Sequence, residues 1–188
     1  MKAPVTLGLV AGMLAALLGA LSPAPGLSVV RAVGPTTHYV AATGSIGAGT
    51  SCADPGYVGT THTPIAAAIA AASQGDTVYV CPGTYQIGST LTIDKSITVA
   101  GAGPTQSILD GGETIRIMAT TNSAIPTRFD ATVSALQFRN GRVTGGNNRG
   151  GAINSALDVT LYVYDSLFRN NRSGDHGGAI NVGVHNVD

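Results

Sequence analysis

Two neighbouring residues near the C-terminus carry side chains that could do chemistry. Asp175 and His176 precede a Gly-Gly pair in a segment typical of an exposed loop. A carboxylate beside an imidazole can hold a metal ion or move a proton. A solvated turn without a chemical role is the alternative, and the corresponding loop at 147–149 contains neither residue type. We therefore predict no catalytic residue and no metal site, and keep Asp175 and His176 as the candidates should a metal bind.

Acidic side chains could also form the pair that glycoside hydrolysis needs. Such a pair lies on one surface, with carboxyl groups roughly 5 Å or 7–10 Å apart. Asp158 and Asp165 are seven positions apart in an alternating segment. Successive side chains of a strand point to opposite faces, so these two would lie on opposite faces of one continuous strand. The spacing argues against a catalytic pair unless a corner interrupts the strand.

The two cysteines of the chain, Cys52 and Cys81, have a spacing that fits neither a redox CxxC motif nor a four-ligand metal site. In an oxidising compartment such a pair forms a disulfide. We predict a Cys52–Cys81 disulfide, with two buried free thiols as the alternative.

The first 32 residues resemble a targeting segment rather than part of a fold. Lys2 is followed by an apolar stretch over 5–21, and small residues lie near Ala32, as in a cleaved secretory signal. The stretch has 17 residues, fewer than the roughly 20 that span a bilayer. We predict a signal peptide over 1–32 and a secreted or cell-surface product. The alternative is that this segment is retained as an anchor. In either case we expect membrane contact only through this segment.

The segment 33–76 contains one helix signal. Pro64 suits the first helical position and Gly75 a left-handed stop. Ile65 and Ile69 lie one turn apart on the same face of this short, alanine-rich helix. We predict an N-terminal segment whose helix packs against another apolar surface.

From 77 to 188 the chain consists of short β-branched runs separated by Gly, Asn and Asp, and it repeats. Phe-Arg-Asn occurs at 138–140 and again at 168–170, and Gly-Gly-Ala-Ile-Asn occurs at 150–154 and again at 177–181. Strands this short could also form a sandwich or a barrel. A repeat with constant ends and a connecting loop of variable length instead indicates a solenoid.

Stacking of such coils places equivalent residues above one another at a strand spacing of roughly 4.8 Å. We expect interior ladders of Phe138 with Phe168, Ile153 with Ile180, and Leu136 with Leu167. Asn140 and Asn170 are expected to stack at a corner, where Asn tolerates left-handed backbone. The helix that carries Ile65 and Ile69 is expected to cover the open first coil.

The composition excludes several classes of protein. The formal net charge is zero, charged residues are 11%, and hydrophobic residues are 44%, which is unlike a disordered chain. Seven of the eight arginines fall within 116–172, interspersed with acids such as Asp130 and Asp165. No basic face is expected from this mixture, and we predict no nucleic-acid partner.

Three segments, 64–85, 97–104 and 108–112, resemble the opening coils of secreted right-handed parallel β-helix proteins of the pectate-lyase-like superfamily. The Gly-Gly-Ala-Ile and Phe-Arg-Asn repeats are similar to those of polymorphic outer-membrane and surface-adhesin β-helices. The resemblance implies an all-β fold, a right-handed parallel β-helix over 77–188 with a short N-terminal capping α-helix. Lyases, glycosidases, epimerases and passive adhesins share this scaffold, so the fold alone does not specify the function.

The resemblance leaves two functions open. In its lyase members, acidic residues bind calcium and a basic residue takes a proton. The nearest candidates lie in no recognisable lyase motif, and they are Asp110, Glu113, Asp130, Arg116 and Arg128. We expect a secreted or surface module without a cofactor that binds glycans or host surfaces through exposed Arg, Asn and Tyr. The alternative is a carbohydrate-active enzyme, either a polysaccharide lyase or a glycoside hydrolase, whose active site is weak or lies beyond this chain. We expect Ca²⁺ as a cofactor only if the protein is a lyase.

The last expected strand begins at Ile180, and no capping element follows it in the sequence. A bare solenoid end exposes unpaired backbone and apolar side chains. We therefore expect this chain to be the N-terminal part of a longer protein, with further β-helix coils as its partner.

Overall fold

A computed structural model describes residues 34–121, 128–145 and 149–183 of the chain. These residues belong to one compact unit, Val33–Asp188. The predicted signal peptide over 1–32 lies outside the described residues.

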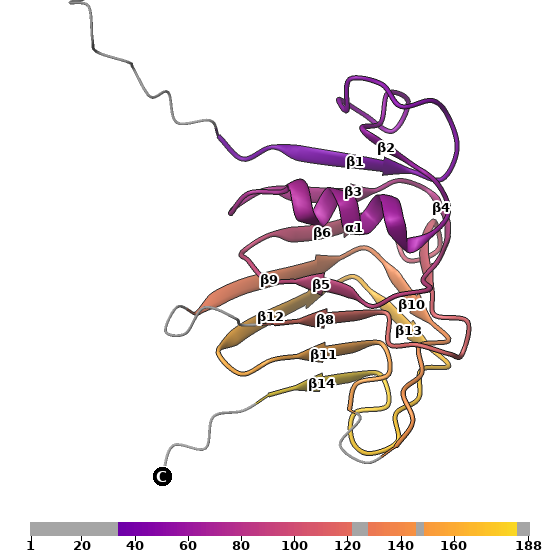
Figure 1. Cartoon of the computed structure of the whole chain (residues 1–188), viewed down its shortest axis with the longest axis vertical. Coiled ribbons are helices and arrows are strands. Elements are labelled where there is room, and N and C mark those ends of the chain that lie inside the picture. Colours follow the sequence, from indigo (N-terminus) through magenta and orange to yellow (C-terminus); the bar gives the residue numbers. More distant parts are fainter. Residues whose placement is uncertain (1–33, 122–127, 146–148, 184–188) are drawn as a thin grey trace, which may run out of the picture. The chain divides into compact units, whose positions relative to one another are not determined.

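The described residues form one helix and fourteen strands (Figure 1). The helix is α1 (His62–Ala71). The strands are β1 (Thr37–Ala41), β2 (Tyr57–Val58), β3 (Thr77–Val80), β4 (Gly83–Gln86), β5 (Leu91–Ile93), β6 (Thr98–Gly101), β7 (Ser107–Asp110), β8 (Met118–Thr120), β9 (Phe129–Ser134), β10 (Gln137–Arg139), β11 (Ile153–Ser155), β12 (Val159–Tyr164), β13 (Leu167–Arg169) and β14 (Ile180–Val182).

The strands assemble into three parallel sheets that the chain visits in turn. Sheet A has the order β12-β9-β6-β3-β1-β2, sheet B the order β13-β10-β7-β4, and sheet C the order β14-β11-β8-β5. Each set of three consecutive strands from β3 onward therefore makes one coil, and the last coil is β12 to β14. A mostly-β chain with three parallel sheets and one short helix is consistent with the predicted parallel solenoid.

The core is a set of ladders to which each coil contributes inward side chains from all three sheets. Four valines line sheet A in register: Val78, Val99, Val133 and Val163. In sheet B, Phe138 lies opposite Phe168 with the ring centroids 5.1 Å apart and the rings nearly parallel. In sheet C, Ile153 lies opposite Ile180. Short strands suffice because each apolar residue packs against its equivalent in the next coil.

One expected ladder is wrong. The structure pairs Leu167 with Gln137, not with Leu136. Leu136 is fully buried, whereas Leu167 is 37% exposed. Because side chains alternate between the two faces of a strand, this offset of one residue moves Leu167 from the interior to the outer face.

The N-terminal segment adds a further turn of the solenoid before the first coil. In this turn the helix occupies the position that a strand of sheet C has in the other coils. β1 pairs with β3 in sheet A, Thr61 bridges Gln86 at the end of β4, and α1 contacts β5. Ile65 and Ile69 are buried in the same core as the ladders. The helix begins at His62, two residues before the expected start at Pro64. Proline is tolerated there because N–H groups of the first turn have no partner within the helix.

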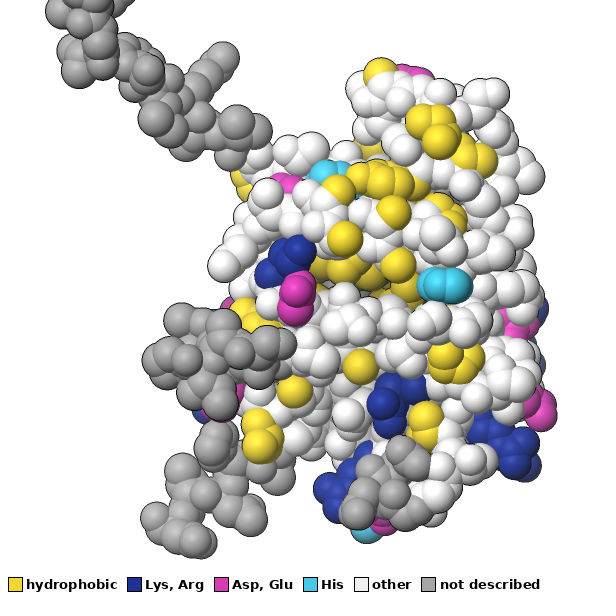
Figure 2. All heavy atoms as spheres, in the orientation of Figure 1, with side chains coloured by type: hydrophobic (Ala, Val, Ile, Leu, Met, Phe, Trp, Pro, Cys, Tyr) yellow, Lys and Arg dark blue, Asp and Glu magenta, His cyan; other side chains and the backbone are white. Residues whose placement is uncertain are grey.

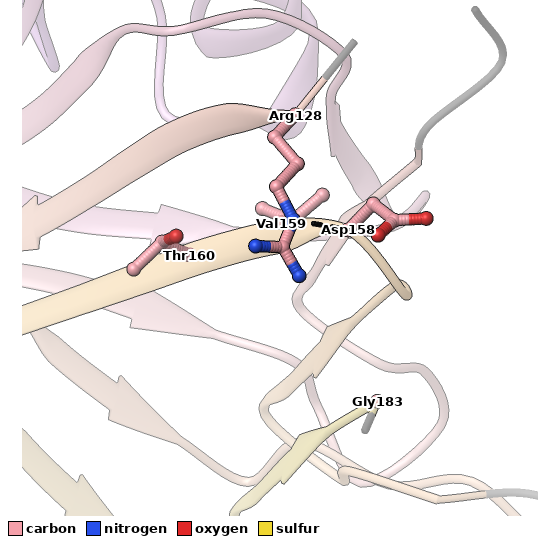
Figure 3. A pocket seen from close by; sticks show the side chains of 5 residues that line it. All are labelled: Arg128, Asp158, Val159, Thr160 and Gly183. Carbon is pink, nitrogen blue, oxygen red and sulfur yellow. Dashed lines mark ion pairs between the residues drawn. The ribbon is translucent and has the colours of Figure 1, made fainter. Parts of the chain in front are cut away.

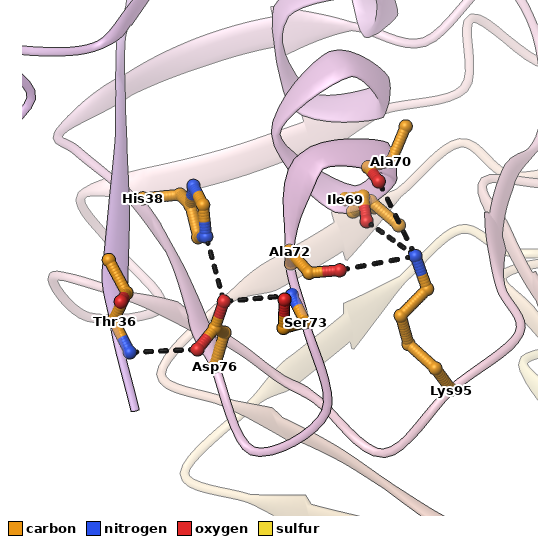
Figure 4. A network of polar contacts seen from close by, with 8 residues as sticks. All are labelled: Thr36, His38, Ile69, Ala70, Ala72, Ser73, Asp76 and Lys95. Atoms are coloured by element: carbon orange, nitrogen blue, oxygen red, sulfur yellow. Dashed lines mark hydrogen bonds and ion pairs between the residues drawn. The ribbon is translucent and has the colours of Figure 1, made fainter. Parts of the chain in front are cut away.

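Two charged side chains hold this turn in place (Figure 4). Asp76 accepts hydrogen bonds from the backbone N–H groups of Thr36 and Ser73, both at 2.8 Å, and from His38 Nε2 at 3.0 Å. The Lys95 ammonium donates to the carbonyl oxygens of Ile69, at 3.3 Å, and Ala72, at 3.2 Å. These carbonyls belong to the C-terminal end of α1, where a cation is favourable.

A disulfide ties the loop between β1 and β2 to the first coil. Cys52 and Cys81 are bonded, with their Cα atoms 5.7 Å apart, and the predicted pair is confirmed. Beneath it, the buried Tyr85 hydroxyl donates to the carbonyl oxygens of Cys81, at 3.0 Å, and Val40, at 3.1 Å. Burial raises the pKa of Tyr85 to about 12, so this hydroxyl remains a donor.

Candidate functional site

The outer surface of sheet A, which we call the sheet A face, carries two columns of aligned side chains. Strand pairing places one residue of each column on each of the sheet A strands β1, β3, β6, β9 and β12. These residues point outward because they alternate along each strand with the inward residues of the core. The first column is Thr37, Thr77, Thr98, Thr132 and Tyr162. The second column is Tyr39, Tyr79, Ala100, Ser134 and Tyr164.

Tyrosine rings lie at both ends of this face. Tyr162 and Tyr164 on β12 are 39% and 53% exposed. Their ring centroids are 6.3 Å apart and their planes differ by 11°. Tyr39 and Tyr79, on β1 and β3, form a tilted pair with centroids 5.5 Å apart. Exposed, mutually ordered aromatic rings are typical of binding surfaces, because they offer a large apolar area with little loss of conformational freedom.

Small side chains separate the two aromatic pairs. The middle strands β6 and β9 present Thr98, Ala100, Thr132 and Ser134 outward. At the strand spacing, β3 and β12 lie about 14 Å apart. The face is therefore a low strip of hydroxyl and methyl groups bounded by tyrosine rings.

Shallow pockets follow the edge where β6, β9 and β12 begin. One, of about 150 Å³, is lined in part by Ser96, Thr98, Asp130 and Thr132. A second, of about 130 Å³, is lined by Arg128, Asp158, Val159, Thr160 and Gly183 (Figure 3). Arg128 Nε lies 3.5 Å from Asp158 Oδ1 across this pocket. Carboxylate and hydroxyl groups thus border the sheet A face along one side.

The side chains of Asp175 and His176 are in contact, and Arg149 also binds the Asp175 carboxylate. Arg149 Nε is 2.9 Å from Asp175 Oδ2, and His176 Nδ1 contacts the other carboxylate oxygen. The hydrogen bond from Arg149 is the main cause that lowers the pKa of Asp175. A guanidinium on the same carboxylate opposes a metal cation. In the part of the chain that the structure describes, no three His, Cys, Asp or Glu side chains form a metal-binding group.

The structure separates the two aspartates considered for glycoside hydrolysis. Asp158 and Asp165 flank the six-residue strand β12. Both adopt positive φ, 61° and 45°, at the corners before and after it. At the rise of an extended strand their Cα atoms lie roughly 23 Å apart, beyond the spacing of a catalytic carboxylate pair.

The residues considered for a lyase form two separate groups, with Asp110, Glu113 and Arg116 at the end of β7 and in the turn after it, and Arg128 and Asp130 at the start of β9. Asp110 ends β7 in sheet B, where its carboxylate binds Arg139 Nε at 2.8 Å and Asn140 Nδ2 at 3.0 Å. Burial would raise the pKa of Asp110, but the Gly112 N–H, Asn140 and Arg139 lower it. Asp130 lies on β9 in sheet A. Asp110 is therefore a structural link between consecutive coils, in a turn completed by Gly112 with φ 58°.

Asparagines mark the corner after sheet B. Asn140 and Asn170 have φ 56° and 53°, and Asn140 Nδ2 reaches Asp110. The amide that joins two coils through the backbone is that of Asn171, one residue further on. Its Oδ1 accepts from the Gly141 N–H at 2.8 Å and its Nδ2 donates to the Phe138 carbonyl at 2.9 Å.

The sheet A face was not predicted from the sequence. Its signal is the period-two alternation of Tyr162, Val163 and Tyr164, which marks a half-buried strand with an aromatic outer face. Strand register, which sequence alone does not supply, is needed to align these tyrosines with the threonine and serine residues of other coils.

Comparisons with protein-family models, with curated proteins and with solved structures find no match to this chain. Among the described residues, no helix is long and apolar enough to span a membrane. The disulfide is compatible with an extracellular protein.

Proposed function

We propose that this chain is a secreted module that binds a polysaccharide on the sheet A face. The observation that carries the proposal is the exposed, nearly parallel ring pair of Tyr162 and Tyr164. A pyranose ring presents a face of C–H groups, which packs on an aromatic ring and is removed from water. Two such rings side by side suit consecutive sugars of a chain better than a single small ligand.

The surroundings of the rings suit a sugar's polar edge. Thr132 and Ser134 lie beside the tyrosines on β9, and Thr160 lies on β12 itself. Hydroxyl groups can donate and accept, as sugar hydroxyls do. Asp130 and Asp158 border the same strip and can accept further hydrogen bonds.

We infer that the solenoid is a right-handed parallel β-helix of the pectate-lyase-like kind. Support comes from the parallel sheets visited in fixed order and from the general right-handedness of connections between parallel strands. The segments and repeats that resemble such proteins point the same way. A signal peptide over 1–32 and export to the cell surface complete this proposal, and the disulfide supports export.

The proposal is tested by affinity electrophoresis of the oxidised protein in gels that contain dextran, xylan, mannan or soluble cellulose derivatives. We expect retardation by at least one neutral polysaccharide. The variant Tyr162→Ala/Tyr164→Ala is expected to weaken this binding about tenfold or more, because both stacking surfaces are lost. Tyr162→Phe/Tyr164→Phe keeps both rings and is expected to retain most of it.

The matched control is Leu167→Ala, which removes an exposed apolar side chain from sheet B instead. Unchanged retardation of the double alanine variant would contradict the proposal, as would equal losses in the control. Release of reducing sugars or unsaturated products from any polysaccharide would favour the carbohydrate-active enzyme.

A further inference from the structure

Arginine side chains gather at one corner of the solenoid, although along the sequence they alternate with acids. We define the arginine corner by the arginines of the turns between sheets B and C and of the strand ends before them. These are Arg116, Arg139, Arg142, Arg149, Arg169 and Arg172. Three carboxylates, Asp110, Glu113 and Asp175, lie in the same region. In Figure 2 most of the dark blue side chains lie over the lower coils of the face shown.

Direct contacts bring the turns of this corner together. The Arg116 guanidinium donates to the carbonyl oxygens of Arg149, at 2.8 Å, and Gly150, at 3.0 Å. The backbone N–H of Arg142 donates to the carbonyl of the residue before Arg116, at 2.8 Å. Arg142 and Arg172 then form a parallel bridge. Residues of three successive coils therefore share one surface.

Two pairs of like charges face each other in register. Arg139 lies opposite Arg169, and Arg142 lies opposite Arg172. Like charges at the strand spacing of roughly 4.8 Å repel each other and destabilise the sheet. Two such pairs in adjacent positions therefore require anionic partners, either within the protein or outside it.

Only part of this charge is compensated. Arg139 pairs with Asp110 at 2.8 Å, and Arg149 pairs with Asp175 at 2.9 Å. Arg142, Arg169 and Arg172 are exposed and make no ion pair with another described residue. Their guanidinium groups are free to bind an external anion.

We propose that the arginine corner binds sulfate or phosphate ester groups of an anionic glycan. A guanidinium donates through a planar fork that matches oxyanions. A tetrahedral ester group has three free oxygens and can accept from two guanidinium groups stacked one coil apart. A planar carboxylate has two oxygens and matches a single fork. The repetition of paired arginines favours a polymer that carries such groups at intervals.

This site is separate from the sheet A face, because it lies between sheets B and C and consists of charged rather than aromatic side chains. The two proposals therefore fail independently. Tyr162→Ala/Tyr164→Ala should leave anion binding unchanged, and substitution of the arginines should leave binding of a neutral polysaccharide unchanged.

The test uses four polymers with one backbone: dextran, carboxymethyl dextran, dextran phosphate and dextran sulfate. Binding of the oxidised protein is measured by surface plasmon resonance at about 0.15 M salt, where weak surface attraction is screened. We expect binding to dextran sulfate or dextran phosphate, and the comparison of the two identifies the ester. Neutral dextran serves as the reference for any binding at the sheet A face.

The decisive variant is Arg142→Gln/Arg172→Gln, which removes a facing pair that makes no ion pair among the described residues. We expect a loss of affinity for the favoured ester of roughly tenfold or more. Arg142→Lys/Arg172→Lys keeps the charge but loses the fork, and an intermediate loss is expected. Arg128→Gln, which removes one positive charge at the edge of sheet A, should alter affinity by less than about twofold.

Several results would overturn the proposal. These are no binding to either ester, equal binding to carboxymethyl dextran, or equal binding to a short DNA duplex, which would indicate a general polyanion surface. The melting temperature of the glutamine variant should stay the same or rise, because a repulsive pair is removed. A clear fall would assign the arginines a structural role instead.

Discussion

Asp76 joins three segments of the N-terminal turn through one carboxylate, which is 6% exposed. Hydrogen bonds from the backbone of Thr36 and Ser73, followed by that from His38, lower the pKa of Asp76 to about 2. An aspartate in an unfolded chain titrates near 3.9. Because the folded value is the lower one, the carboxylate stabilises the fold above about pH 4, and this contribution is lost as the pH falls through about 2.

We expect Asp76→Asn to lower the free energy of unfolding at pH 6 by about 2–3 kcal/mol, the amount that corresponds to the pKa shift. The loss should shrink between pH 4 and pH 2. Urea unfolding at several pH values, with the disulfide intact, measures both. Asp165→Asn is the control, because Asp165 is exposed and asparagine tolerates its positive φ. A loss for Asp76→Asn that does not depend on pH would contradict the assignment.

The contacts of a residue could be predicted from the sequence where its partners follow from the local pattern, and not where the partners are distant in the chain. The disulfide followed from there being only two cysteines. The hydrogen bonds of Asp76 to Thr36 and His38 span 40 and 38 positions. No local pattern announces such contacts, because they depend on how β1 pairs with β3.

At the scale of elements, α1 is stabilised from outside its own sequence. It has ten residues, no acidic residue in its first turn and no basic residue in its last. A helix this short is marginal alone in water. Burial of its isoleucines in the core stabilises the helix, and the Lys95 ammonium compensates the charge of its C-terminal carbonyls.

Lys95→Met keeps the aliphatic stem but removes the charge from these carbonyls. We expect a loss of about 1 kcal/mol, because the end of the helix dipole is no longer compensated. The melting temperature should fall by roughly 2–4 °C. Hydrogen exchange of the last amides of α1 should accelerate, while exchange in β12 should not. Lys95→Arg retains the charge and should restore most of the protection, and equal exchange in both variants would argue against this role.

Elements were easier to predict than their register. The alanine-rich run and the β-branched runs indicate the helix and the short strands, and the Phe-Arg-Asn repeat matches β10 and β13. The pairing of Gln137 with Leu167 keeps the 30-residue offset of Phe138 and Phe168, whereas the expected ladder of Leu136 with Leu167 used an offset of 31. The positive φ of the corner residues Ala135 and Asp165, 54° and 45°, was not predictable, because such non-glycine residues are uncommon.

At the scale of the whole molecule, function depends on which residues the coils bring into line. The tyrosines and threonines of the sheet A face come from five strands that span 37–164. The arginine corner combines turns that are 26 to 34 positions apart. A net charge of zero is therefore compatible with a corner where arginines outnumber carboxylates six to three, because the composition does not show which turns meet.

The last described coil shows how much a neighbouring coil contributes. Phe138 and Ile153, which have a coil on either side, are fully buried. Their equivalents Phe168 and Ile180, in the last described coil, are only partly buried. We propose that a further coil of the same repeat fits this end, since it would continue both ladders and pair with the outer edges of β12, β13 and β14.

Fusion of an additional copy of 156–182 directly after Val182 tests this fit, because this copy begins with the sheet A strand β12 and keeps the order of the three sheets. We expect a higher melting temperature, because the copy would cover Phe168 and Ile180 and add parallel strand pairs, and stability in such stacks grows with each interface. Hydrogen exchange in β13 and β14 should slow at the same time. A Gly/Ser tail of equal length is the control, since it adds chain but no ladder residues. If the two fusions melt at the same temperature and β14 exchanges equally fast in both, the end of the solenoid does not accept a further coil.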